Sequence, residues 1–319
     1  MENLENKKYW IWFSLIKGLG CVRKNKLLKI YGTPEKIYKL SKSELLKIDG
    51  IGEETVTNII EAKNEKILNY HIKYMKENNI DIIHICEKSY PQILKQIYDA
   101  PVSLYIRGNK EILNGKNVGI VGCRECTDYG KKAAKYFAYN LSKEKSVNIV
   151  SGLARGVDSY AHWGSVGANI EFESTKNCGK EQTNCEKLDI TCEKLKNSCG
   201  KTIAVLGNGL DMIYPKENIE LANEIIRSGG AIISEYPCGT KPDKMNFPAR
   251  NRIISGLSKG IIVIEAKEKS GTLITVDFAL EQGRDVFVVP GNINSINSVG
   301  TNDLIKQGAK MVTSYEDIK

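Results

Sequence analysis

The stretch "GIIVIEAKEKSGTLITVDFALEQGRDVFVVPG" (Gly260–Gly291) decides the fold of this chain. It opens with a run of β-branched residues, passes through a Ser-Gly-Thr turn into a helical segment, and ends in a second apolar run. Strands that are apolar along their whole length are buried on both faces, as in a parallel sheet covered by helices. The stretch therefore predicts a strand–helix–strand unit.

The same texture recurs from about residue 80 to the C-terminal end of the chain. Short β-branched runs alternate with helical segments and lie at residues 80–85, 103–108, 117–122, 147–152, 202–207, 231–235, 260–266, 285–291 and 310–314. This alternation predicts an α/β fold with an extended, Rossmann-like, doubly wound and mostly parallel sheet. In such folds ligands bind beyond the carboxyl ends of the strands, where glycine-rich loops occur in this sequence.

Residues 1–78 predict a small all-helical domain that precedes the Rossmann-like domain at 79–319. Its glycine turns, "KGLG" (Lys17–Gly20) and "IDGIGEET" (Ile48–Thr55), are similar to halves of helix-hairpin-helix or SAM-like units. Such turns either present backbone N–H groups to a phosphate or simply connect the helices of a bundle, and the sequence leaves both open.

Residues 169–201 interrupt the alternation and contain Cys178, Cys185, Cys192 and Cys199, each seven residues after the last. In a helix, positions seven apart are separated by about 10 Å, whereas sulfurs on one zinc ion lie within about 4 Å of each other. We therefore expect a surface insertion. Metal or redox use in a non-helical form is the alternative.

The composition limits the class of protein. No apolar run is long enough for a membrane span or placed as in a signal peptide, so we expect a cytoplasmic protein with reduced thiols. With three scattered histidines we expect no metal site, and no cofactor fingerprint is present. The net charge of +8 is compatible with a polyanionic partner.

Two glycine-rich loops follow predicted strands and carry arginines. "GIVGCRECTDYG" holds Cys123 and Arg124, and Arg124 is suited either to an anion or to a salt bridge with a neighbouring loop. "SGLARGVDSYAH" places Arg155 on a turn. Asp158 and His162 follow one helical turn apart, and a structural hydrogen bond between them is favoured over an acid–base pair.

The stretch "NFPARNRIISGLSKG" (Asn246–Gly260) predicts a helix entered through Pro248, with Arg250 and Arg252 in its first turn. Cations there oppose the helix dipole by about 0.3–1 kcal/mol, so a negative partner is expected. That partner is either a phosphate, which requires the arginines to face solvent, or a carboxylate such as Asp243.

Further candidates flank this helix and open the next. Lys241, Lys244 and Phe247 combine cations with an aromatic ring, as single-strand sites do, although Phe247 could instead staple the helix to the core. The residues Ser270–Thr272 could form an anion nest, cap their own helix, or do both. Together the loops predict a phosphate backbone as partner.

In this order, "GIVGCRECTDYG", "SGLARGVDSYAH", "TIAVLGNGLDMIYP", "SEYPCGTKP", "FPARNRIISGLS" and "GTNDLIKQGA" resemble the DNA-processing protein A family (DprA, also called Smf). The resemblance implies sequence-independent binding of single-stranded DNA, protection of incoming strands in natural transformation, loading of the RecA recombinase, and a homodimer formed through the sheet domain. It places the DNA pocket at Gly122, Cys123, Arg124, Lys244, Phe247 and the turn of Arg250, Asn251 and Arg252.

The chain departs from the family pattern at three places. Cys123 stands where Ser or Thr is usual, residues 169–201 replace a short connection, and we expect no winged-helix tail beyond Lys319.

The main alternative function is a nucleoside monophosphate phosphoribohydrolase on a related fold. Such chemistry needs an acid–base carboxylate, and Thr275 stands where a glutamate is expected. An NAD-dependent oxidoreductase lacks its G-x-G-x-x-G fingerprint here. We therefore predict that the protein is not an enzyme.

Overall fold

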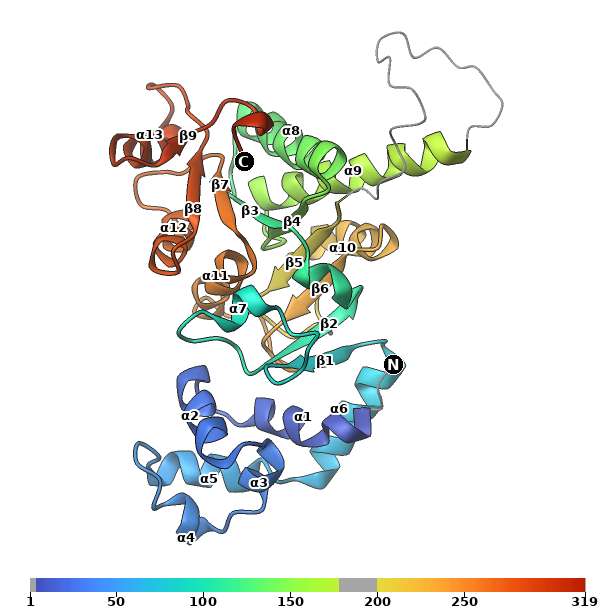
Figure 1. Ribbon diagram of the computed structural model, residues 1–319, viewed down its shortest axis with the longest axis vertical. Helices are drawn as coiled ribbons and strands as arrows, with labels where there is room; N and C mark the ends of the chain where they lie inside the picture. Colours follow the sequence, from blue (N-terminus) through green and yellow to red (C-terminus); the bar gives the residue numbers. More distant parts are fainter. Residues whose placement is uncertain (1–3, 178–199, 319) are drawn as a thin grey trace.

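The computed structural model describes residues 4–177 and 200–318, and its centre is one mixed sheet of nine strands (Figure 1). The strands are β1 (Asp81–His84), β2 (Ser103–Gly108), β3 (Asn117–Val121), β4 (Asn148–Ser151), β5 (Thr202–Leu206), β6 (Ala231–Ser234), β7 (Gly260–Val263), β8 (Asp285–Val288) and β9 (Lys310–Met311). Every strand overlaps one of the β-branched runs, so the predicted fold class is confirmed.

The strand order is β1-β2-β6-β5-β4-β3-β7-β8-β9. From β3 the chain winds outward through β4 and β5 to β6, then returns to the other side of β3 with β7. The pairs β1–β2 and β2–β6 are antiparallel and all others are parallel. The reversal creates a topological switch point between β3 and β7, where their carboxyl ends leave room for a ligand.

Helices cover both faces of the sheet. They are α7 (Gln92–Lys95), α8 (Asp128–Lys145), α9 (Val157–Asn177), α10 (Ile219–Arg227), α11 (Asn246–Leu257), α12 (Gly271–Glu281) and α13 (Val299–Lys306). On β4, Ile149 packs into a cluster with α8 and α9, whereas Val150 joins a cluster with α7, α11 and α12 on the opposite face. This alternation explains why the strands are apolar throughout.

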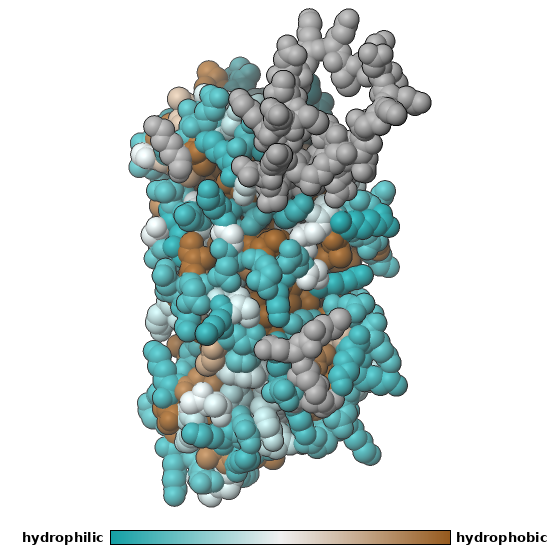
Figure 2. Space-filling view, turned by 45° about the vertical axis from the view of Figure 1, so that its right-hand side comes forward, coloured by the Kyte–Doolittle hydropathy of each residue, from teal (hydrophilic) through white to brown (hydrophobic). Residues whose placement is uncertain are grey.

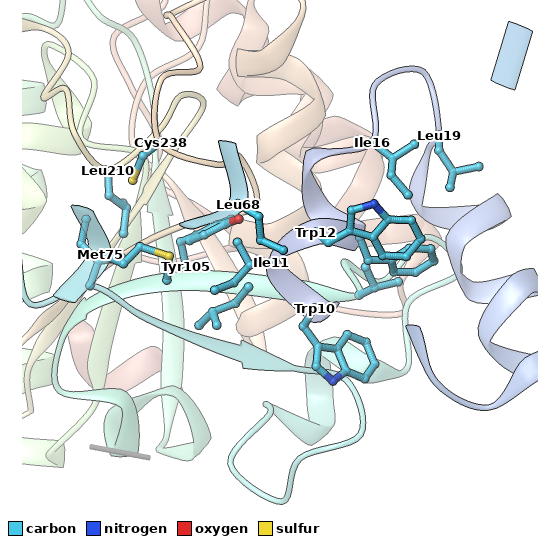
Figure 3. Packing of buried hydrophobic residues seen from close by; sticks show 14 of the residues in the cluster. Trp10, Ile11, Trp12, Ile16, Leu19, Leu68, Met75, Tyr105, Leu210 and Cys238 are labelled. Carbon is cyan, nitrogen blue, oxygen red and sulfur yellow. The ribbon is translucent and has the colours of Figure 1, made fainter. Parts of the chain in front are cut away.

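The N-terminal region is helical, as predicted. It comprises the 3-10 turn η1 (Leu4–Lys7) and the helices α1 (Lys8–Leu15), α2 (Cys21–Tyr31), α3 (Pro34–Tyr38), α4 (Lys42–Leu45), α5 (Glu53–Glu61) and α6 (Glu65–Glu77). These helices share one hydrophobic cluster with the sheet, which includes Trp12 and Met75 from the helices and Tyr105 from β2 (Figure 3). Because the cores are continuous, the division at residue 78 stays a prediction.

The insertion was predicted to begin at residue 169. Helix α9 instead continues to Asn177, and the four cysteines at seven-residue spacing lie outside the described residues. Hydrophilic residues cover most of the face shown in Figure 2, and apolar surface gathers at its middle. Among the described residues no helix is long and apolar enough to cross a membrane.

Candidate functional site

A cavity of about 610 Å³ opens at the switch point, beyond the carboxyl ends of β3 and β7. Loops that follow β3, β4 and β7 line it together with the first turns of α11 and α12. The structure brings most of the predicted site residues to this crevice, namely Gly122, Cys123, Arg124, Lys244, Phe247, Arg250, Asn251, Ser270, Gly271 and Thr272.

The loops after β3 and β4 are packed backbone to backbone. The N–H of Val157 donates to the carbonyl of Cys123 at 3.1 Å, and the N–H of Cys123 donates to the carbonyl of Glu265 at 2.9 Å. Gly156 has φ +75°, and a Cβ there would lie 2.3 Å from the carbonyl oxygens of Cys123 and Arg124. Glycine is therefore required at this position, and the backbone that carries Arg124 is fixed.

An aromatic pair with a cation above it forms one wall of the crevice. The rings of Phe247 and Tyr214 stack with centroids 5.6 Å apart and an interplanar angle of 27°. The guanidinium of Arg124 lies 5.6 Å from the centroid of the Phe247 ring. Tyr214 is 44% exposed, so this wall can accept a further planar group. Sequence reasoning missed Tyr214, although "GLDMIYP" was recognised as a motif.

The crevice lining also contains three lysines. Lys267 and Lys269 join Lys244 there, and sequence reasoning missed both because they lie in a run of mixed charges. Lys267 pairs with Glu125 at 3.2 Å. Arg124, Lys244 and Lys269 form no ion pair with an acid in the part of the chain that the structure describes.

Helix α12 begins at the floor of the crevice. The Ser270 hydroxyl accepts a hydrogen bond from the Thr272 N–H at 3.1 Å, so Ser270 is the N-cap of this helix. Capping satisfies one N–H group of the first turn and leaves the positive end of the helix dipole at the crevice. Its use as an anion nest stays a prediction.

Helix α11 starts at Asn246, two residues before the predicted entry at Pro248, so Arg250 and Arg252 lie beyond its first turn. The prediction that Arg250 faces solvent is wrong, because only 4% of it is exposed. Its Nη1 donates to the carbonyl oxygen of Gly152 at 2.6 Å and to that of Val205. Burial lowers its pKa to about 10, while the charge of Asp158 opposes that shift.

Arg252 lies on the other side of α11, away from the crevice, and the solvent-facing prediction is wrong for it too. It is 6% exposed; its Nε pairs with Asp99 and its Nη2 with Glu235, both at 2.8 Å. Two carboxylates are therefore the negative partner of this arginine, and neither of them is Asp243. The sequence does not single out Asp99 or Glu235 as partners of Arg252. Both are remote from it along the chain, Glu235 by 17 residues and Asp99 by many more.

Two further candidates do not line the crevice. Arg155 forms an ion pair with Glu217 in which Nη2 lies 3.1 Å from Oε2, beside a small hollow next to Tyr214 and Phe247. Lys241 is exposed and lies outside both the crevice and this hollow.

His162 does not pair with Asp158, so the expected hydrogen bond between them is wrong. The Asp158 carboxylate accepts from the N–H of Gly152 at 3.1 Å, and His162 Nδ1 lies 2.6 Å from the Thr202 hydroxyl. That hydroxyl donates to the Ile149 carbonyl at 2.9 Å, so it accepts from Nδ1–H. Burial, reinforced by the charge of Arg250, lowers the pKa of His162 to about 3.

Comparison with known proteins decides the family. Residues 81–184 and 188–319 match the family described as DNA recombination-mediator protein A, and residues 14–64 match a SAM-like helix-hairpin-helix tandem. The chain belongs to the DNA recombination-mediator protein A family. It is 37% identical over 309 residues to the DNA processing protein DprA of Streptococcus pneumoniae, covering 90% of this chain and 97% of that protein. It is 40% identical over 271 residues to that of Bacillus subtilis, covering 85% of this chain and 80% of that protein.

Solved structures agree with this assignment to the DNA recombination-mediator protein A family. The DNA processing protein A of Streptococcus pneumoniae superposes with a TM-score of 0.78 at 34% identity, over 98% of this chain and 96% of that one. The protein from Helicobacter pylori, described as having a unique single-stranded DNA binding mode, superposes with a TM-score of 0.58 at 27% identity, over 75% of this chain and 93% of that one. The resemblance seen in the motifs is thus confirmed.

Replacing Arg252 with Ala should lower the free energy of unfolding by about 3–5 kcal/mol, since Asp99 and Glu235 would lose a buried partner. Arg155→Ala is the matched control, because its pair with Glu217 is exposed to solvent and should contribute little to stability. Urea unfolding of both variants measures the difference. Equal stability of the two variants would show that the Arg252 pairs contribute nothing beyond a surface contact.

Acid should weaken the fold through His162. A group whose pKa falls from 6.5 to about 3 on folding stays neutral in the native state, so protonation favours the unfolded chain as the pH drops below 6.5. This histidine alone should remove about 2 kcal/mol between pH 7 and pH 5. His162→Gln keeps a donor for Thr202 and cannot titrate, so its urea midpoint should depend less on pH over that range. An unchanged pH dependence would contradict the assigned neutral state.

Proposed function

We propose that the crevice at the switch point binds single-stranded DNA without sequence preference. The observation that carries this proposal is the stacked pair of Phe247 and Tyr214 with the Arg124 guanidinium over the ring. Lys244 and Lys269 line the same crevice and have no carboxylate partner among the residues that the structure describes. Aromatic faces accept any base and cations follow the phosphates, which is how sequence-tolerant single-strand sites work. The described binding mode of the Helicobacter pylori relative supports the proposal.

The electrostatics of the crevice favour a phosphate backbone over a compact anion. Arg124 lies in the loop that follows β3, Lys244 lies in the segment that follows β6, and Lys269 lies just before α12. Their positive charges therefore reach the crevice from three separate segments of the chain. A single phosphate would engage only part of this set. A chain of phosphates would engage all of it, with about one contact per cation.

We also propose the wider role that the family resemblance implies: protection of incoming single strands in natural transformation, loading of RecA on them, and homodimerisation through the sheet domain. These roles require DNA binding at the crevice first. A strand-exchange assay with RecA and a single-strand binding protein tests loading, and analytical ultracentrifugation tests the dimer.

We propose that the protein acts by binding and not by catalysis. Thr275 lines the crevice where a phosphoribohydrolase needs a carboxylate. Of the acids that line the crevice, Asp158 faces Arg250 and accepts backbone N–H bonds, while Glu125 pairs with Lys267. Release of adenine from AMP by the pure protein would contradict this proposal.

Fluorescence anisotropy with labelled oligo-dT and with a duplex of equal length should show preference for the single strand. If about four phosphates are neutralised, log affinity against log salt should have a slope near −3. Arg124→Ala and Lys244→Ala should each make this slope shallower by about 0.7, whereas Lys241→Ala, outside the crevice, should leave it unchanged. Equal affinity for the duplex, or a slope near zero, would contradict the proposal.

Phe247→Ala should weaken oligo-dT binding by about 1–3 kcal/mol and leave the salt slope unchanged, because a stacking contact releases no counterion. Tyr214→Ala should behave in the same way if the second ring receives a base. The same salt titration, carried out on both variants, measures the two effects separately. A changed slope with little loss of affinity would mean that the rings only orient Arg124.

A further inference from the structure

The crevice adjoins a small hollow that shares its aromatic wall. Phe247 and Tyr214 line both of them, and so do Arg124 and Arg250. Arg155 lines only the hollow. The hollow therefore connects the loop that follows β3 with the loop that follows β4, at the carboxyl edge of the sheet. A single strand that stacks on the two rings can leave the crevice in this direction.

Helices α8 and α9 begin at this same edge and run side by side (Figure 1). The loop that carries Arg124 leads into α8, and the loop that carries Arg155 leads into α9. The two helices approach closely at Gly164 of α9, where a Cβ would lie 2.6 Å from the carbonyl oxygen of Lys135 in α8. Their first turns therefore lie together, next to the hollow.

A tyrosine in the first turn of α9 has two ammonium groups near its ring. The N–H of Tyr160 donates to the carbonyl of Gly156 at 3.1 Å, so Tyr160 is one turn away from the glycine that packs on the backbone of Arg124. The Nζ atoms of Lys131 and Lys135 lie 5.9 and 5.4 Å from the centroid of the Tyr160 ring. Both lysines belong to α8 and are one turn apart, so the ring keeps two positive charges close together.

These two ammonium groups share a single carboxylate. Lys131 pairs with Asp128 at 2.8 Å, and the Asp128 side chain is 85% exposed. Lys135 is exposed and forms no ion pair with an acid of residues 4–177 and 200–318. Like charges near one ring repel each other, and an exposed ion pair offsets little of that repulsion. A further anion is therefore favoured at this place, and a phosphate has the complementary charge.

The acids between the crevice and these lysines already have partners. Asp158 is buried and accepts hydrogen bonds from backbone N–H groups. Glu125 and Glu217 are exposed, and they pair with Lys267 and Arg155. Exposed pairs contribute little to stability, so a phosphate can take over their cations at little cost. A phosphate backbone can therefore pass along this edge of the sheet.

We propose that single-stranded DNA continues from the crevice, past Arg155, over the face formed by Lys131, Lys135 and Tyr160, which we call the α8–α9 face. The two lysines bind phosphates of the segment that leaves the crevice. This inference rests on the proposed binding of single-stranded DNA at the crevice, and it lengthens that site. A long strand should therefore engage more cations of the protein than a short one.

Two lengths of labelled oligo-dT distinguish the α8–α9 face from the crevice: about six nucleotides for the crevice alone, and about twenty for both. Salt titrations of the full chain, followed by fluorescence anisotropy, give one slope for each length. Lys135→Ala should make the slope for the long strand shallower by about 0.7 and leave that for the short strand unchanged. Lys131→Ala combined with Lys135→Ala should double this effect. Arg124→Ala should make both slopes shallower.

Lys132→Ala is the matched control and should leave both slopes unchanged. Lys132 is exposed on the same helix and forms no ion pair with a described acid, but adjacent helix positions lie on different faces. A long-strand slope that is unaffected by the double variant, or that Lys132→Ala changes as much as Lys135→Ala does, overturns the α8–α9 face and leaves the crevice proposal intact. A short-strand slope that is unaffected by Arg124→Ala overturns the crevice proposal and this inference with it.

Discussion

The guanidinium of Arg250 holds helix α11 against the carboxyl ends of two parallel strands. Its bonds reach the carbonyl of Gly152 just beyond β4 and that of Val205 in β5. Close approach is possible only because residue 152 is glycine, since a Cβ there would lie 2.7 Å from both the guanidinium and the Asp158 carboxylate. This buried contact fixes α11 at the edge of the sheet, together with the apolar residues Ile253, Ile254 and Leu257 that pack into the core.

Helix α11, held in this way, presents side chains to two different surroundings. Phe247 is three residues before Arg250 and faces the crevice, where it meets Tyr214 and Arg124. Arg252 is two residues after it and points away, into the ion cluster with Asp99 and Glu235. Neighbouring arginines on one helix therefore have different tasks, because positions two apart on a helix lie on different faces.

Periodicity and motif order were sufficient to predict the sheet and its nine strands, and they selected ten of the 21 residues that line the crevice. They could not predict which basic side chains form ion pairs with carboxylates in the folded protein. Arg124 and Arg252 look alike in the sequence, yet the first is exposed over a ring and the second is buried between carboxylates from other elements. Such pairings depend on which side chains the fold brings together, and a single sequence does not record them.

Whether a cation already has a carboxylate partner in the folded protein determines how readily it can bind a phosphate of a nucleic acid. Arg252 would have to abandon a buried pair, which costs several kcal/mol, so it is unavailable to DNA. Arg155 and Lys267 form solvent-exposed pairs with Glu217 and Glu125, which contribute little to stability, so a phosphate can replace the carboxylate at little cost. Arg124 and Lys244 form no ion pair with any acid of residues 4–177 and 200–318, so they have no carboxylate to exchange for a phosphate. The cations near the crevice therefore differ in how readily they can bind a phosphate. The folded structure determines this difference, because it decides which cations already have a carboxylate partner and how deeply that pair is buried.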